Sequence, residues 1–186
     1  MINKNLKKKL KKIKAVAFDG DGVLFSGRVF IDPVRGEVLK ERSHIDGHGI
    51  SLLRAAGLRI AIVSAEKTGF LEMVGEKLNS LPAAKSRKWH EIDIFTGFQS
   101  EQKVKVIDGW LKRIEVKWEE CAAMGDDLTD YQLLKAAGFA VAPAQAEVVI
   151  KEIVHYVTPR EGGNGAIRDF CNLILKVKGF DPITKK

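Results

Sequence analysis

The chain's architecture follows from residues 15–24, Ala15-Val16-Ala17-Phe18-Asp19-Gly20-Asp21-Gly22-Val23-Leu24. The apolar first half is typical of a buried parallel strand, and the glycines after it indicate a tight loop at the strand's carboxyl end. Open α/β sheets bind their ligands at this end of their strands. Asp19 and Asp21 could converge on one hard cation, and one of them could act as a nucleophile. The stretch alone also fits a nucleotide-sugar metal site, a calcium loop or a capped turn.

The net charge of +7 is concentrated at the N-terminus. Residues 1–14 hold seven lysines and no acid, which leaves 24 basic residues against 24 acidic ones in the rest of the chain. Leu6, Leu10 and Ile13 lie at helical spacing among these lysines, which predicts either an amphipathic surface helix or a frayed basic tail. We expect a basic arm or helix over 1–14, a single domain over 15–178 and a tail over 179–186. We do not expect nucleic-acid binding.

Nothing in the sequence predicts insertion into a membrane. The N-terminal segment lacks the continuous apolar stretch of a signal peptide, and no segment approaches the ~20 apolar residues of a membrane span. Cys121 and Cys171 lie far apart inside apolar patterns. Such cysteines are typical of buried thiols in a reducing compartment, so we expect a cytoplasmic protein.

Strands and helices alternate along the chain, which predicts a doubly wound parallel α/β sheet. A β-hairpin is expected after the first strand, because two alternating segments flank the turn-rich residues 32–36. Asp46-Gly47-His48-Gly49 is interpreted as a loop before a helix. Another helix is expected over residues 66–78. The other expected strands cover residues 58–63, 121–124, 139–142 and 154–157, with a possible one at 92–95.

Several polar or charged residues lie where an expected strand ends or an expected helix begins. They are Asp19 and Asp21, Ser64, Lys103, and Asp126, Asp127 and Asp130. In a parallel sheet these ends share one edge. Together the side chains supply what phosphoryl transfer needs: a nucleophile, a proton-transfer carboxyl, a cation site, a phosphate donor and a fixed positive charge.

These motifs, in this order, resemble those of the haloacid dehalogenase superfamily of phosphatases over residues 15–177. His44-Ile45-Asp46-Gly47-His48-Gly49 and the tail around Gly162-Gly163-Asn164-Gly165 resemble its 3-deoxy-D-manno-octulosonate 8-phosphate phosphatase branch. The resemblance implies a Rossmann-like domain without a cap, a Mg²⁺ cofactor and a homotetramer. About forty residues separate Asp21 from Ser64, which leaves no room for a large cap domain.

The resemblance implies a role for each motif residue. Asp19 is the nucleophile, and Asp21 protonates the leaving oxygen and then activates water. Ser64 and the backbone of Gly20 to Gly22 hold phosphoryl oxygens, and Lys103 neutralises charge. The metal is implied to be held by Asp19, Asp126 and the backbone carbonyl of Asp21. Asp127 and Asp130 are implied to hold the metal site and Lys103 in place without binding the ion directly.

Each role has a structural alternative. The three later aspartates and Ser64 could cap helices, and Lys103 could be a solvated helix lysine. His48, Arg160 and Arg168 could contact the substrate, the arginines through bidentate pairing with a carboxylate, or they could have no such role.

The chain also departs from the branch pattern. Ala65-Glu66 stands where the branch has glycine and a basic residue, Asn164 replaces an arginine, and residues 80–98 are longer than expected. We expect a Mg²⁺-dependent phosphomonoester hydrolase acting on 3-deoxy-D-manno-octulosonate 8-phosphate. The alternatives are a nonulosonate 9-phosphate, another sugar phosphate, or a non-catalytic binding module that uses the basic arm.

Overall fold

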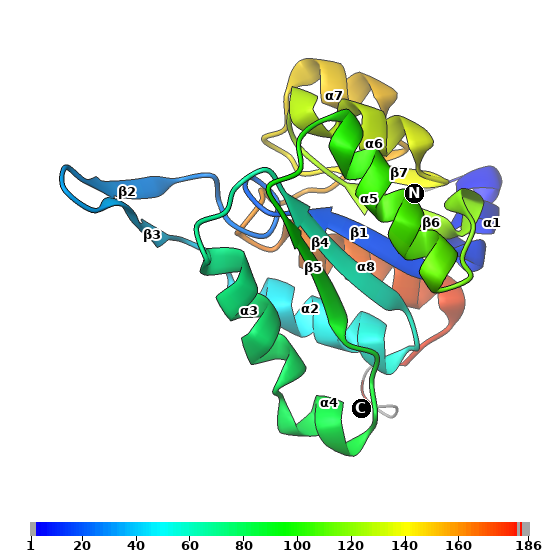
Figure 1. Ribbon diagram of the computed structural model, residues 1–186. Helices are drawn as coiled ribbons and strands as arrows, with labels where there is room; N and C mark the ends of the chain where they lie inside the picture. Colours follow the sequence, from blue (N-terminus) through cyan, green and yellow to red (C-terminus); the bar gives the residue numbers. More distant parts are fainter. Residues whose placement is uncertain (1–2, 182, 184–186) are drawn as a thin grey trace.

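Six parallel strands form the central sheet of the computed structural model, which describes residues 3–181 and 183. The strand order is β5-β4-β1-β6-β7-β8, so the first strand lies in the interior of the sheet (Figure 1). The strands are β1 (Ala15–Asp19), β4 (Arg59–Ser64), β5 (Ile92–Thr96), β6 (Cys121–Met124), β7 (Phe139–Ala142) and β8 (Tyr156–Val157). The possible strand near residue 92 is therefore an edge strand, and the last strand is shorter than expected.

Helices cover both faces of this sheet. Alternate residues of β1 face opposite sides, since Val16 and Phe18 lie in one core cluster while Ala15 and Ala17 lie in the other. The first face carries α1 (Lys4–Lys12), α2 (His44–Ala55), α3 (Phe70–Asn79) and α8 (Ala166–Lys178). The second face carries α5 (Glu101–Arg113), α6 (Tyr131–Ala136) and α7 (Val148–Ile153). The predicted doubly wound α/β fold is confirmed.

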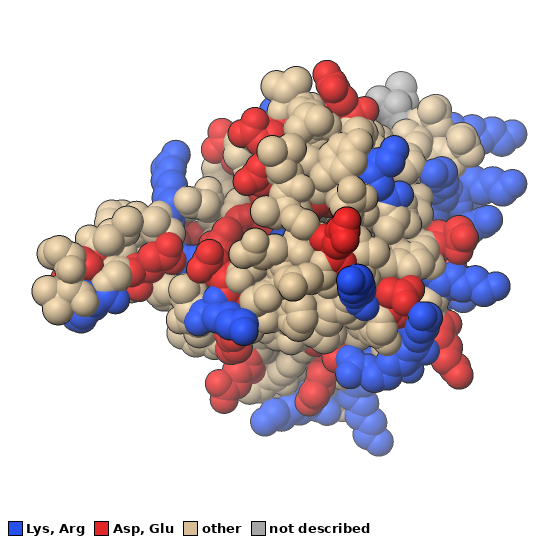
Figure 2. All heavy atoms as spheres, turned by 45° about the horizontal axis from the view of Figure 1, so that its top comes forward, with Lys and Arg blue, Asp and Glu red and all other residues tan. Residues whose placement is uncertain are grey.

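The predicted hairpin is also present, as β2 (Val29–Asp32) and β3 (Gly36–Lys40), and it projects away from the domain (Figures 1 and 2). Asp32 closes its turn, because one carboxylate oxygen accepts the backbone N–H groups of Val34 and Arg35. Several large apolar side chains on it are exposed, namely Val29, Phe30, Ile31, Val34 and Leu39.

The interpretation of Asp46-Gly47-His48-Gly49 as a loop is wrong, because α2 already begins at His44. Its two glycines allow close packing within the helical layer. A Cβ on Gly49 would lie 3.1 Å from the Cys171 Sγ atom of α8 and 3.2 Å from the Arg168 Cα atom. Close helix contact, and not a turn, accounts for these glycines.

The segment between β4 and β5 differs from expectation as well. Its helix, α3, begins at Phe70 instead of near residue 66, after Gly69 in the left-handed conformation. A short helix, α4 (Pro82–Ser86), lies within the longer-than-expected region.

The basic N-terminal segment is a helix, α1, that packs on α8. Leu10 and Ile13 are fully buried in the first core cluster, and Leu6 packs against it. Residues 1–2 of the expected arm, and residues 182 and 184–186 of the expected tail, lie outside the described residues. Across residues 3–181 and 183, none of the helices has the length and hydrophobicity needed to cross a membrane.

Candidate active site

The predicted residues of the four phosphatase motifs meet at the carboxyl ends of three neighbouring strands. β1 ends at Asp19, β4 ends at Ser64, and β6 is followed by residues 125–130. Because β1 pairs with β4 on one side and β6 on the other, these ends surround one cavity of about 260 Å³. Its lining is Asp19, Asp21, Gly22, Ser26, Gly27, Ser64, Ala65, Glu66, Lys103, Asp126, Asp127, Thr129 and Gln145.

A buried cation, Lys103, joins two of the carboxylates. Its Nζ atom donates to Asp19 Oδ1 at 2.5 Å and to Asp130 Oδ1 at 2.7 Å, and its side chain is only 1% exposed. Burial lowers the pKa of Lys103, but Asp19 and Asp130 outweigh this effect and raise the pKa above its ordinary value. Lys103 is therefore a fixed positive charge beside Asp19, and the alternative of a solvated helix lysine is wrong.

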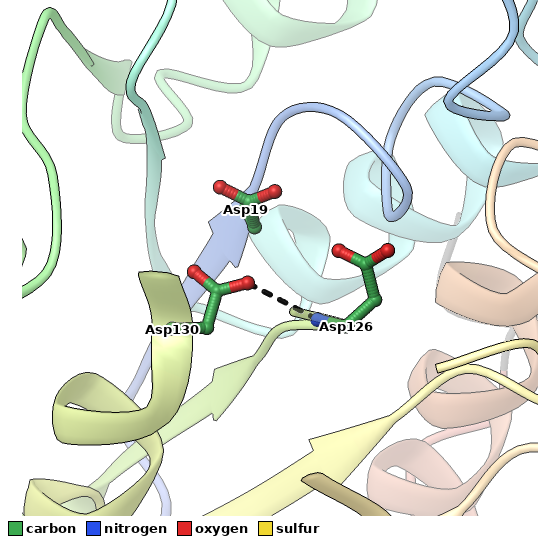
Figure 3. Close-up of side chains that lie close together, drawn as sticks. All are labelled: Asp19, Asp126 and Asp130. Atoms are coloured by element: carbon green, nitrogen blue, oxygen red, sulfur yellow. Dashed lines mark hydrogen bonds between the residues drawn. The ribbon is translucent and has the colours of Figure 1, made fainter. Parts of the chain in front are cut away.

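Three carboxylates form a group that could hold a cation. One oxygen from each of Asp19, Asp126 and Asp130 lies within 4.8 Å of the others (Figure 3). Burial and the charge of Asp130 raise the pKa of Asp19 well above its ordinary value, although Lys103 opposes the shift. The pKa of Asp126 is raised to about 7, mainly by burial and then by the negative charges of Asp130 and Asp127. A divalent cation would relieve this repulsion.

The donor set fits Mg²⁺. All the available donors are hard oxygens, which this ion prefers. The Oδ1 atom of Asp126 is buried and has no hydrogen-bond partner among the described residues. The oxygens of Asp130, in contrast, are already engaged: Oδ1 accepts from Lys103 and Oδ2 accepts the backbone N–H of Asp126 (Figure 3). These contacts support Asp19 and Asp126 as ligands and Asp130 as the residue that holds them.

Two glycines of the first loop make room for the site. Gly22 has φ +78°, and a Cβ there would lie 2.0 Å from Asp126 Oδ2. A Cβ on Gly20 would lie 2.9 Å from the Ser64 Cβ atom. The loop therefore approaches the two neighbouring strand ends more closely than any side chain would permit.

Of two residues that could cap helices, Ser64 does not cap one and Asp127 does. Ser64 Oγ accepts the backbone N–H of Glu66 at 3.1 Å, but α3 begins only at Phe70, so Ser64 does not cap that helix. Asp127 does act as a cap, since its carboxylate accepts the N–H of Leu128 at the start of a short 3₁₀ turn (Leu128–Asp130). Ser64 is buried at the cavity and remains the predicted phosphate donor.

The structure places three predicted substrate-binding residues outside this cavity. Arg160 forms a bidentate ion pair with Asp169, with its Nη2 atom 2.6 Å from Oδ1. The Nη1 atom of Arg168 lies 3.1 Å from His48 Nδ1, and its Nε atom donates to Asn172. His48 lines a separate cavity of about 300 Å³ between α2 and α4. A role for these residues in substrate binding remains a prediction.

Two residues at the site were not found by sequence reasoning. Lys40, at the end of the hairpin, donates to Asp21 Oδ1 at 2.7 Å. Gln145 donates from Nε2 to the carbonyl of Gly22 at 2.6 Å and accepts the N–H of Gly162. Both lie far along the chain from the motif they support, so no local pattern indicates them.

Comparison with known proteins agrees with this geometry. Residues 59–168 match the family of haloacid dehalogenase-like hydrolases. The chain is 31% identical to the 3-deoxy-D-manno-octulosonate 8-phosphate phosphatase of Yersinia pestis, over 88% of this chain and 80% of the relative. It is 30% identical to the corresponding enzyme of Haemophilus influenzae, over 94% of this chain and 89% of the relative.

Solved structures lead to the same group. The Moraxella catarrhalis phosphatase, in complex with a magnesium ion, a phosphate ion and 3-deoxy-D-manno-octulosonate (KDO), superposes with a TM-score of 0.82 at 27% identity, covering 94% of this chain and 92% of that one. The cobalt-bound Haemophilus influenzae enzyme gives a TM-score of 0.82 at 30% identity, covering 95% and 98%. The chain therefore belongs to the haloacid dehalogenase-like hydrolase family.

Proposed function

We propose that this protein is a Mg²⁺-dependent phosphatase that hydrolyses a small phosphorylated sugar acid through an aspartyl-phosphate. The leading substrate is 3-deoxy-D-manno-octulosonate 8-phosphate, the substrate in the names of its relatives. The observation that carries the proposal is the cluster of Asp19, Lys103, Asp126 and Asp130 at the end of the interior strand β1.

The reaction has two displacements at phosphorus. A carboxylate oxygen of Asp19 attacks, the bond from phosphorus to the sugar oxygen breaks, and Asp21 gives its proton to that oxygen. Asp21 then takes a proton from water as the water oxygen attacks phosphorus, and the bond to Asp19 breaks to release phosphate. Lys103 and Ser64 stabilise the charge on the phosphoryl oxygens. Mg²⁺, held by Asp19, Asp126 and the backbone carbonyl of Asp21, would supply further charge neutralisation when bound.

The charges around the cavity favour a second class of substrate. Its lining holds five carboxylates against the single cation Lys103, and one of these acids, Glu66, follows the predicted phosphate donor Ser64. A phosphate ester without a carboxylate would meet less repulsion here than a sugar acid would. Phosphates of uncharged sugars are therefore one alternative to be tested. A nonulosonate 9-phosphate, which is a sugar acid like the leading substrate, is the other.

The direct test is phosphate release from a panel of these three substrate types, with Mg²⁺ and with a chelator. We expect turnover only when Mg²⁺ is present, and we expect Asp19→Asn to have no turnover. Glu152→Gln, which neutralises an exposed carboxylate on α7 in the same way, is the matched control and should retain full activity. Folded wild-type protein that releases no phosphate from any ester would overturn the proposal.

The proposed place of action is the cytoplasm, which agrees with two buried free cysteines. A binding module that uses α1 is the rival function. It predicts polyanion binding that weakens steeply with salt and disappears when the exposed lysines of α1 are replaced by glutamine. The organised carboxylate cluster favours the enzyme.

A further inference from the structure

Lys40 has a buried side chain although it lies on an exposed part of the chain. It ends β3, on a hairpin that projects from the domain, yet its side chain is only 3% exposed (Figure 1). Its Nζ atom lies 2.7 Å from Asp21 Oδ1 and 3.4 Å from Glu37 Oε2. The same atom lies 5.9 Å from the ring centroids of both Phe25 and Phe70. Lysine side chains are almost never this buried unless they are paired.

The contact makes the two oxygens of Asp21 different from each other. Among residues 3–181 and 183, Oδ1 accepts from Lys40, while Oδ2 has no hydrogen-bond partner. Asp21 lines the cavity that also contains Asp19. A carboxylate fixed through one oxygen keeps the second one in a defined place, where it can transfer a proton.

We propose that Lys40 is a positioning residue for Asp21, and that it aims the Oδ2 atom at the leaving oxygen of the substrate. This inference rests on the proposed phosphatase function. The two aromatic rings and Glu37 restrict where the ammonium group can lie, so the orientation of Asp21 depends on them as well. A backbone hydrogen bond from Ser26 to the carbonyl of Glu41 holds the base of the hairpin to the catalytic loop.

Leaving-group chemistry distinguishes positioning from a general structural role. A sugar alkoxide needs a proton in order to leave, whereas the nitrophenolate of p-nitrophenyl phosphate leaves without one. In Lys40→Met we expect kcat/KM for the best sugar phosphate to fall by about 10- to 100-fold, and kcat/KM for p-nitrophenyl phosphate by less than about 3-fold. The ratio kcat/KM is compared because it reports only the steps up to departure of the leaving group, so the later hydrolysis of the aspartyl-phosphate, in which Asp21 also acts, does not enter it. Asp21→Asn should show the same selectivity, and the double variant should be no slower than Asp21→Asn alone.

Two further variants complete the experiment. Lys40→Arg retains the charge and should recover part of the lost sugar-phosphate turnover. Lys105→Met removes an exposed lysine on α5, away from the hairpin, and should leave both rates unchanged. Equal losses on the two esters, or an additional loss in the double variant, would overturn the inference. If Lys40→Met does not fold, Lys40→Arg and Lys40→Gln are compared with the wild type instead. A ratio of the two rates that equals the wild-type ratio in both variants would also overturn the inference. Inactivity of the wild type on both esters would instead overturn the proposed function.

Discussion

At the scale of single residues, Lys103 determines both charge balance and stability in the site. Replacing it with methionine leaves Asp19 and Asp130 buried side by side without their cation. Breaking a buried ion pair from one side costs about 3–5 kcal/mol, so we expect Lys103→Met to lower the free energy of unfolding by about that amount and to abolish turnover. Urea unfolding measures the first effect. Lys105→Met, an exposed lysine on the same helix, is the control and should change stability by less than ~0.5 kcal/mol.

Asp126 links the stability of the metal-free protein to pH. Its pKa is raised from 3.8 to about 7 in the folded state, so between these values the folded protein binds more protons than the unfolded chain. The stability of the metal-free protein should therefore decrease as pH rises from about 4 to 7. Mg²⁺ binds the ionised form and should raise the melting temperature more at pH 8 than at pH 5.5.

Asp126→Asn tests this linkage by thermal unfolding. The variant should be more stable than the wild type at pH 7 without metal, and Mg²⁺ should raise its melting temperature much less. An equal increase on adding Mg²⁺ to the variant and the wild type would show that the ion binds elsewhere.

The sequence predicts the residues that stand at strand ends, but it does not reveal two that support them. Asp19, Ser64 and Asp126 each follow an apolar run, so their position in the sheet can be predicted from the pattern alone. Lys40 and Gln145 reach the site only through tertiary contacts. No property of their immediate neighbours distinguishes them from any surface lysine or glutamine.

At the scale of elements, α2 shows why Asp46-Gly47-His48-Gly49 is helical and not a loop. Two glycines and an aspartate are typical of a turn. Here the Asp46 carboxylate is buried and accepts the backbone N–H groups of Gly165 and Arg168, both at 2.9 Å. It therefore caps α8 from a neighbouring helix, and Gly49 lets the two helices approach. These requirements come from the packing of α2 on α8, which a local pattern cannot reveal.

The same scale accounts for α1, whose apolar face belongs to the core. Leu10 is fully buried although it lies between lysines. Leu10→Ala should lower the free energy of unfolding by about 2–5 kcal/mol, through lost burial and the cavity left behind. Lys8→Ala, an exposed position on the same helix, should change it by less than ~0.5 kcal/mol. Equal small effects in chemical denaturation would mean that α1 is an arm and not part of the domain.

At the scale of the whole molecule, the basic charge of α1 and the exposed apolar residues of the hairpin lie on opposite sides. Figure 2 shows many lysine and arginine side chains on the side of the molecule opposite the hairpin, the side where Figure 1 places α1. The hairpin instead exposes Phe30 at 61%, Ile31 at 71% and Leu39 at 60%. Several exposed large apolar side chains on one protruding element are typical of a protein–protein interface.

The resemblance to the capless phosphatase branch implies a homotetramer, and we predict that the protein assembles through this hairpin. Residues 3–181 and 183 include no separate cap domain over the site, and a neighbouring subunit could close the cavity over a small substrate. The double change Phe30→Glu and Ile31→Glu places charge on the apolar surface, and analytical ultracentrifugation should show species smaller than a tetramer. The KM for the best sugar phosphate should rise at the same time, because the assembled site is lost. Val148→Glu, at an equally exposed valine on α7, is the control and should change neither quantity. A wild-type protein that sediments as a monomer with undiminished activity would rule out this role for the hairpin.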